Sequence, residues 1–173
     1  MARIPPVEPD NEPAELKPVF DQLRATRGRV PGMYRTLAHQ PAVLAAHRAY
    51  FHAALDAGVL SRPFKEKIAW RVARLRGSDY SGASHRSYAL KHGVTEAELA
   101  IIDRGDYARL QPREMAALTF AEAMVRGQGK VSDAVFGALQ QHFNATEMVE
   151  IAALVGIMEL ASSLGAVFEL KAD

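Results

Sequence analysis

The sequence predicts an all-α protein of six or more helices in a single domain. Apolar residues recur mainly three and four positions apart, runs of β-branched residues long enough for strands are few, and capping residues separate the apolar segments. The 173 residues are 49% hydrophobic, which is enough to bury a substantial core. We therefore expect one domain over residues 1–173, in which residues 1–11 form a proline-rich extended arm.

Helix-starting and helix-ending residues divide the first half of the chain into five helices. Asn11 can cap the first helix, and Pro18 should make its first turn irregular because proline lacks a backbone N–H. Gly77 should end one helix and allow the next to turn back on it, which predicts an antiparallel hairpin. The expected helices span about residues 12–26, 31–39, 41–57, 63–77 and 78–92.

The second half is predicted to contain four more helices. Thr95 and Glu98 have the spacing of a capping box, and Thr146 is expected to cap the last helix. That helix is apolar on nearly every side between Ile151 and Leu164, so it must be covered by neighbouring helices or by another subunit. Because residues 151–158 are too apolar to face water, we expect a homo-oligomer. These helices span about residues 95–104, 112–126, 132–142 and 147–170.

Charge and composition exclude several classes of function. The formal net charge is +1, so neither nucleic acid nor an anionic membrane is an expected partner. The chain has no cysteine, which excludes disulfides and thiol redox chemistry within it. No apolar stretch approaches the ~20 residues of a membrane span, and the N-terminus lacks the apolar run of a signal peptide, so a cytoplasmic location is expected.

Polar residues with helical spacing concentrate between residues 64 and 85. In a helix over residues 78–92, Ser78, Ser81 and His85 stand at positions i, i+3 and i+7 and therefore share one face. Ser78 lies at the helix N-terminus, where free N–H groups favour an anion. The spacing predicts that a small carboxylate can be held here.

Three segments carry a resemblance to a known family. They are the N-terminal stretch from Arg3 to Leu44, the segment IAWRVARLRGSDYSGASH over residues 68–85 and the segment GVTEAEL that follows it. Together they resemble the carboxymuconolactone decarboxylase and alkylhydroperoxidase D-like superfamily. The resemblance implies an alkylhydroperoxidase D-like helical bundle and favours a homotrimer or homohexamer.

The resemblance also implies a site. The redox members of the family have a glutamate, a Cys-x-x-Cys pair and a histidine, and here these positions hold Glu66, Ser78, Ser81 and His85. A serine hydroxyl cannot pass through sulfenic acid or disulfide states, so the peroxidase chemistry of the family is not available. We expect all four residues to line one pocket, with Glu66 and His85 within hydrogen-bond reach.

Simpler interpretations of the same residues stay open. Ser78 can serve only as a helix cap, and Ser81 can bond a backbone carbonyl one turn earlier. Glu66 lies between two lysines, as solvent-exposed charges often do, and His85 can be structural. Glu159, in the apolar last helix, should be paired or have a shifted pKa.

Three functions are compatible with the sequence. The first is a non-redox decarboxylase, isomerase or lyase that acts on a small carboxylated or lactone-like substrate, with Glu66 and His85 as general acid and base and the serines as hydrogen-bond donors. The second is an alkylhydroperoxidase-type antioxidant protein whose cysteines have been lost or replaced. The third is a non-catalytic oligomeric binding protein. No metal or cofactor is expected, because the histidines have no recognised metal-ligand spacing.

Overall fold

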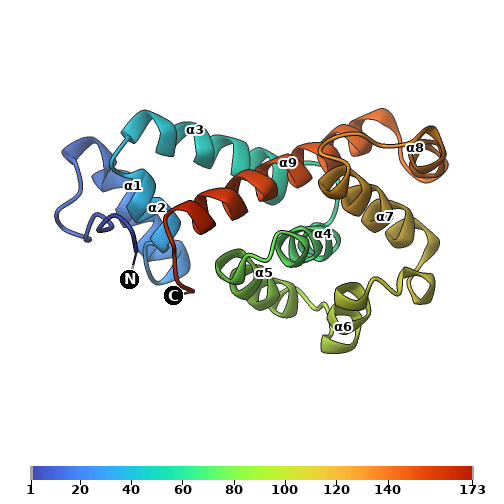
Figure 1. Ribbon diagram of the computed structural model, residues 1–173. Coiled ribbons are helices and arrows are strands. Elements are labelled where there is room, and N and C mark those ends of the chain that lie inside the picture. Colours follow the sequence, from blue (N-terminus) through green and yellow to red (C-terminus); the bar gives the residue numbers. More distant parts are fainter. Residues whose placement is uncertain (1, 173) are drawn as a thin grey trace.

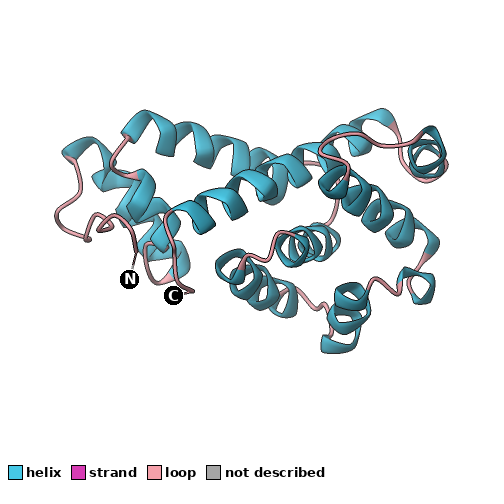
Figure 2. Cartoon of the chain, in the orientation of Figure 1, coloured by secondary structure: helices cyan, strands magenta, loops and turns pink. Residues whose placement is uncertain are grey.

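The computed structural model describes residues 2–172. Over that range the chain forms nine α-helices and no strand, as the sequence predicts (Figures 1 and 2). The helices are α1 (Lys17–Arg27), α2 (Gly32–Leu37), α3 (Pro41–Phe51), α4 (Arg62–Leu75), α5 (Asp79–Lys91), α6 (Glu96–Arg104), α7 (Pro112–Arg126), α8 (Asp133–Gln140) and α9 (Ala145–Val167).

Two predicted caps are wrong. Asn11 does not cap the first helix: a 3-10 turn, Ala14–Leu16, precedes α1, whose first turn holds Pro18. Asn144 rather than Thr146 caps α9, because its Oδ1 accepts from the Glu147 N–H at 3.0 Å while the Glu147 carboxylate accepts from the Asn144 N–H at 3.0 Å. The capping box of Thr95 and Glu98 is confirmed.

Helix α4 is the centre of the molecule. It packs against α5, α6, α7 and α9, and its contact with α5 is the most extensive between any two helices of residues 2–172 (Figure 1). The short connection between α4 and α5 contains Gly77 in a left-handed conformation (φ +61°), which allows the predicted antiparallel hairpin. Every residue from 65 to 73 is buried, including four with charged side chains.

The four buried charges of α4 each have a partner on another helix. Lys65 pairs with Glu150 of α9, and Glu66 pairs with His85 of α5. Lys67 bonds Glu98 of α6 at 2.6 Å and Glu114 of α7 at 2.5 Å, and Arg71 bonds Glu122 of α7 at 2.6 Å. Each neighbour of α4 is therefore tied to it by at least one ionic hydrogen bond.

Much of the apolar stretch of α9 is covered by the same chain, whereas Val149, Leu160 and Val167 of that helix are exposed. Ile151, Leu154, Ile157 and Met158 are completely buried within the protomer, against α4, α7 and the other elements that pack on α9 (Figure 1). By length and composition alone α9 could cross a membrane, contrary to the sequence-based expectation, but these contacts are those of a core helix. These buried residues need no second subunit, and the homo-oligomer stays a prediction.

The N-terminal residues form a second, smaller hydrophobic cluster. Residues of α1, α2 and the start of α3 pack there against Ala161 and Leu164 of α9. The arm is docked, since the Arg3 N–H donates to the Phe168 carbonyl at 3.0 Å and the Val7 N–H donates to the Arg35 carbonyl at 3.0 Å. The two ends of the described chain therefore lie side by side (Figure 1).

Glu122 gives a test of the ionic contacts. Its carboxylate accepts from Arg71 at 2.6 Å, from Tyr107 at 2.7 Å and from Arg126 at 2.7 Å. Burial raises the pKa of Glu122, but the hydrogen bonds from Tyr107, Arg71 and Arg126 outweigh it and lower the pKa to about 2. Because this lies below the pKa of about 4.3 of an unfolded chain, the contribution is present near neutral pH and is lost as the pH falls from about 5 towards 2.

We therefore expect Glu122→Gln to lower the free energy of unfolding near pH 7 by about 1–3 kcal/mol and to weaken the loss of stability below about pH 5. Urea unfolding across that pH range measures both effects. Glu96→Gln is the control, since Glu96 forms an exposed pair with Arg86 and should change stability by less than about 1 kcal/mol. Equal effects of the two substitutions would contradict this account.

Candidate active site

Glu66 and His85 form a buried pair across the α4–α5 hairpin, as predicted. The Glu66 Oε2 atom lies 2.8 Å from His85 Nδ1, and the two side chains are 0% and 6% exposed. Because α4 and α5 run in opposite directions from Gly77, residues nineteen apart in sequence meet at the same level of the hairpin. The solvent-exposed interpretation of Glu66 is wrong, because the helix that carries it is buried on that side.

Arg62 holds the other oxygen of Glu66 and was not predicted from the sequence. Its Nε donates to Glu66 Oε1 at 2.6 Å, one helical turn along α4. Burial raises the pKa of Glu66, but the charges and hydrogen bonds of His85 and Arg62 outweigh burial, so the pKa lies below its usual value. Glu66 is therefore ionised at neutral pH, and the Arg-x-x-x-Glu spacing was the signal for its partner.

The pair fixes the orientation of the His85 ring. A carboxylate can only accept a hydrogen bond, so His85 Nδ1 must carry the proton that it donates to Glu66. In the neutral ring Nε2 then presents a lone pair. No hydrogen bond joins Nε2 to any residue in the described range, so this nitrogen is available to a ligand.

The two serines differ in their contacts. Ser78 caps α5, since its Oγ accepts from the Ser81 N–H at 3.3 Å. Ser81 is buried on the His85 side of α5, and its hydroxyl forms no hydrogen bond with residues 2–172, so the predicted bond to a carbonyl is not present. Ser81 is thus the serine whose hydroxyl can serve a ligand beside His85.

Aromatic rings continue from His85 towards the N-terminal helices. The Phe51 ring centroid is 6.3 Å from that of His85, and the His47 ring stacks on Phe51 at 6.1 Å. His47 is buried, and both of its ring nitrogens are without a hydrogen-bond partner in the described chain. Burial lowers the pKa of His47, so the ring is neutral at pH 7.

A hollow of about 860 Å³ lies next to the pair. Its lining includes Phe51, which contacts His85, and Arg62, which bonds Glu66, but it includes none of the four predicted site residues. The prediction that the four line one pocket is therefore not confirmed by this hollow. The described residues include no group of three or more metal-ligating side chains.

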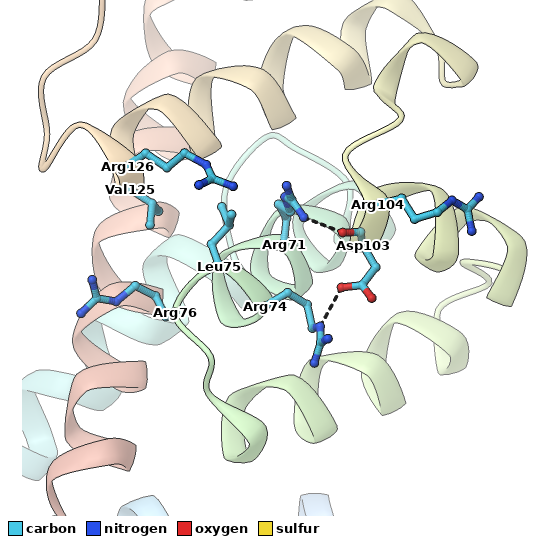
Figure 3. A pocket seen from close by; sticks show the side chains of 8 residues that line it. All are labelled: Arg71, Arg74, Leu75, Arg76, Asp103, Arg104, Val125 and Arg126. Carbon is cyan, nitrogen blue, oxygen red and sulfur yellow. Dashed lines mark hydrogen bonds and ion pairs between the residues drawn. The ribbon is translucent and has the colours of Figure 1, made fainter.

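A second hollow, of about 570 Å³, lies towards the other end of α4 and contains five arginines (Figure 3). Arg74 donates to the Asp103 carboxylate at 2.7 Å, and Arg71 donates to the Asp103 backbone carbonyl at 2.8 Å (Figure 3). Arg126 bonds Glu122. Because Arg71, Arg74 and Arg126 already bind protein acceptors, we assign this hollow a structural role.

The predicted ion pair of Glu159 is not present within the described chain. The residue is only half-buried on α9, and it forms no ion pair with any residue in the described range. Its position in an apolar sequence was misleading, because one side of α9 is not covered completely.

One family model matches the part of the chain that contains this pair. Residues 41–123, which contain both members of the pair, match the model of the carboxymuconolactone decarboxylase family. No curated protein matches the sequence significantly.

Solved structures share the fold. A protein of Ralstonia eutropha JMP134, described as an alkylhydroperoxidase AhpD core and an uncharacterized peroxidase-related protein, superposes with a TM-score of 0.88 at 23% identity, over 99% of this chain and 92% of its own. A peroxidase-related protein of Silicibacter sp. TM1040 gives 0.87 at 21% identity, over 99% and 90%. A cysteine-to-alanine variant of the debrominase Bmp8, in complex with 2,3,4-tribromopyrrole, gives 0.86 at 20% identity, over 100% and 94%.

At these identities the solved structures establish the fold, and the family match adds the sequence relationship. The Glu66–His85 hairpin lies within the matched segment, whereas α1, α2 and α9 lie outside it. Residues 41–123 therefore match the carboxymuconolactone decarboxylase family, and the whole chain has the alkylhydroperoxidase AhpD-like fold.

Proposed function

We propose that the protein is a non-redox enzyme in which His85 acts as a general base and then as a general acid on a small carboxylated or lactone-like substrate. The observation that carries the proposal is the buried contact between Glu66 and His85 Nδ1, which leaves Nε2 without a hydrogen-bond partner among residues 2–172. A histidine oriented by a buried carboxylate is the usual arrangement for proton transfer near neutral pH. Decarboxylation, isomerisation and lyase reactions all need such a transfer.

In the proposed reaction Nε2 removes a proton from a carbon next to a carbonyl group. The electron pair of the broken C–H bond moves into the enolate, and the Ser81 hydroxyl donates a hydrogen bond to the enolate oxygen. The protonated His85 then returns the proton to another carbon in an isomerisation. In a decarboxylation the C–CO₂ bond breaks first, CO₂ leaves and the electron pair moves into the enolate. His85 then acts only as a general acid and gives the carbon a proton that Nε2 has taken from solvent. Glu66 stabilises the imidazolium in both cases.

Cysteine-free composition favours this proposal over the antioxidant alternative. Both sulfur positions implied by the family resemblance are oxygen in this chain, so no thiolate can attack a peroxide. The debrominase among the structural neighbours acts on a substrate quite unlike a peroxide, so the fold itself accommodates more than one chemistry.

The tautomer of His85 can be tested without a substrate. In ¹⁵N-labelled protein at about pH 8, we expect Nδ1 to be the protonated nitrogen and Nε2 the unprotonated one, because the Glu66 carboxylate selects this form. Long-range ¹H–¹⁵N correlation spectra distinguish the two nitrogens. Protonation on Nε2 instead would show that the pair does not orient a base.

Loss of the base should abolish proton transfer. Small lactones, β-keto acids and unsaturated carboxylates are incubated with the protein in D₂O, and deuterium uptake or CO₂ release is followed by NMR and gas analysis. For any substrate that reacts, we expect His85→Gln to lower kcat by ~10²–10⁴-fold. His142→Gln, which changes an exposed histidine, is the control. Undiminished turnover in His85→Gln would refute the proposed role.

The unmodified chain should not reduce hydroperoxides with a dithiol. A double variant with Ser78→Cys and Ser81→Cys places one thiol at the α5 N-terminus, where the free N–H groups lower a thiol pKa. Peroxide consumption in this variant alone would support descent from a redox site. Robust peroxide reduction by the chain without cysteine would contradict the proposal and favour the antioxidant alternative.

A further inference from the structure

The hollow beside the catalytic pair has a distinct chemical character, and we call it the basic hollow. At about 860 Å³ it falls within the usual range of small-molecule sites. Helices α1, α3, α4 and α5 and the π-helical turn His52–Asp56 all contribute to its wall. The residues that decide its chemistry are Arg27, Arg48, Arg62, Lys91, Tyr34 and Tyr88.

The positive charge of the basic hollow is not balanced by the protein. Asp56 is the only carboxylate in the lining, and it pairs with Arg62, which also bonds Glu66. Arg48 donates to the neutral Gln22 Oε1 at 2.9 Å. Arg27, Arg48 and Lys91 form no ion pair with residues 2–172, so three cations around one cavity are free to meet an anion.

Aromatic rings hold Arg27 in position without neutralising its charge. The Arg27 guanidinium lies over Tyr34 at 5.9 Å and over Tyr88 at 5.5 Å. The Arg62 guanidinium lies over the same Tyr88 ring at 5.5 Å, so the ring contacts two guanidinium groups. A stacked guanidinium keeps its N–H groups available for a carboxylate and loses little freedom when it binds one.

We infer that the basic hollow binds a planar anionic ligand, and that Arg27 and Arg48 recognise its negative groups. The charge supplies attraction for the anionic groups, and the rings of Tyr34, Tyr88 and Phe51 offer surfaces for a flat ligand body. Phe51 and Arg62 connect the hollow to His85 and Glu66, so a ligand held there lies next to the proton-transfer pair. Only this last step rests on the proposed function.

Binding is tested with probes of one shape and different charge. Phthalate, benzoate and benzamide carry two, one and no negative charges on similar rings. Isothermal titration calorimetry should give the tightest Kd for phthalate, a weaker one for benzoate and no measurable binding for benzamide. Raising the salt from about 50 to about 500 mM should weaken phthalate binding, because salt screens the attraction. Equal affinities for phthalate and benzamide would overturn the assignment.

Variants assign the residues. We expect Arg27→Gln and Arg48→Gln each to weaken phthalate binding at least about tenfold, and Arg27→Lys to retain part of the affinity because it keeps the charge. Arg104→Gln is the matched control: Arg104 lines the other arginine-rich hollow and should leave the Kd unchanged (Figure 3). Thermal melting confirms that each variant is folded. If Arg27→Gln destabilises α1, Arg48→Gln on α3 still tests whether the basic hollow binds the anion.

His85→Gln separates this inference from the proposed function. It should retain phthalate binding, because His85 does not line the basic hollow. If phthalate fails to bind the wild type, or binds Arg27→Gln and Arg48→Gln as tightly, the basic hollow is not an anion site, whatever His85 does. If phthalate binds as expected but His85→Gln retains turnover of a substrate, the anion site stands and the acid–base role is wrong.

Discussion

The structure depends on the cost of burying charge in its central helix. Residues 65–73 of α4 are all buried, and four of them are charged. An isolated ion inside a protein costs several kcal/mol, so each of these side chains requires a partner, and each finds one on a different neighbour of α4. This requirement sets how α5, α6, α7 and α9 are placed around α4. The Glu66–His85 pair is one of these ties, and it differs from the others because its distal nitrogen is unused.

Local sequence signals predicted the elements well and the burial of α4 poorly. Capping residues, prolines and glycines act within a few residues, so the limits of α6 and α7 and the α4–α5 hairpin followed from the chain directly. The alternation of lysine and glutamate at the start of α4 looked like an exposed surface. The partners of these lysines are Glu98, Glu114 and Glu150. They lie far along the sequence, and no local pattern identifies them.

The candidate site was predictable to the same extent. Helical spacing and the family resemblance correctly predicted the contact between Glu66 and His85 and placed Ser81 one turn before His85 on α5. The contribution of the N-terminal helices was not predictable, because Arg27 and Tyr34 reach the site through tertiary packing and lie outside the segment that matches the family model. Under the proposed function, the residues that transfer the proton and part of the wall that binds the ligand would therefore come from separate segments of the chain.

The docked arm has a consequence for local unfolding. The smaller hydrophobic cluster joins α1 and α2 to the end of α9, and the contact between Arg3 and Glu169 closes a loop of nearly the whole chain. Contacts between residues so far apart in sequence have the largest entropic cost of loop closure. Few buried ion pairs stabilise the contacts of this cluster. Opening of this cluster would remove Arg27 from the basic hollow while α4 and its ionic partners stay folded. The affinity for the ligand therefore depends on the free energy of opening this cluster alone. Amide hydrogen exchange measures that free energy separately from the free energy of global unfolding.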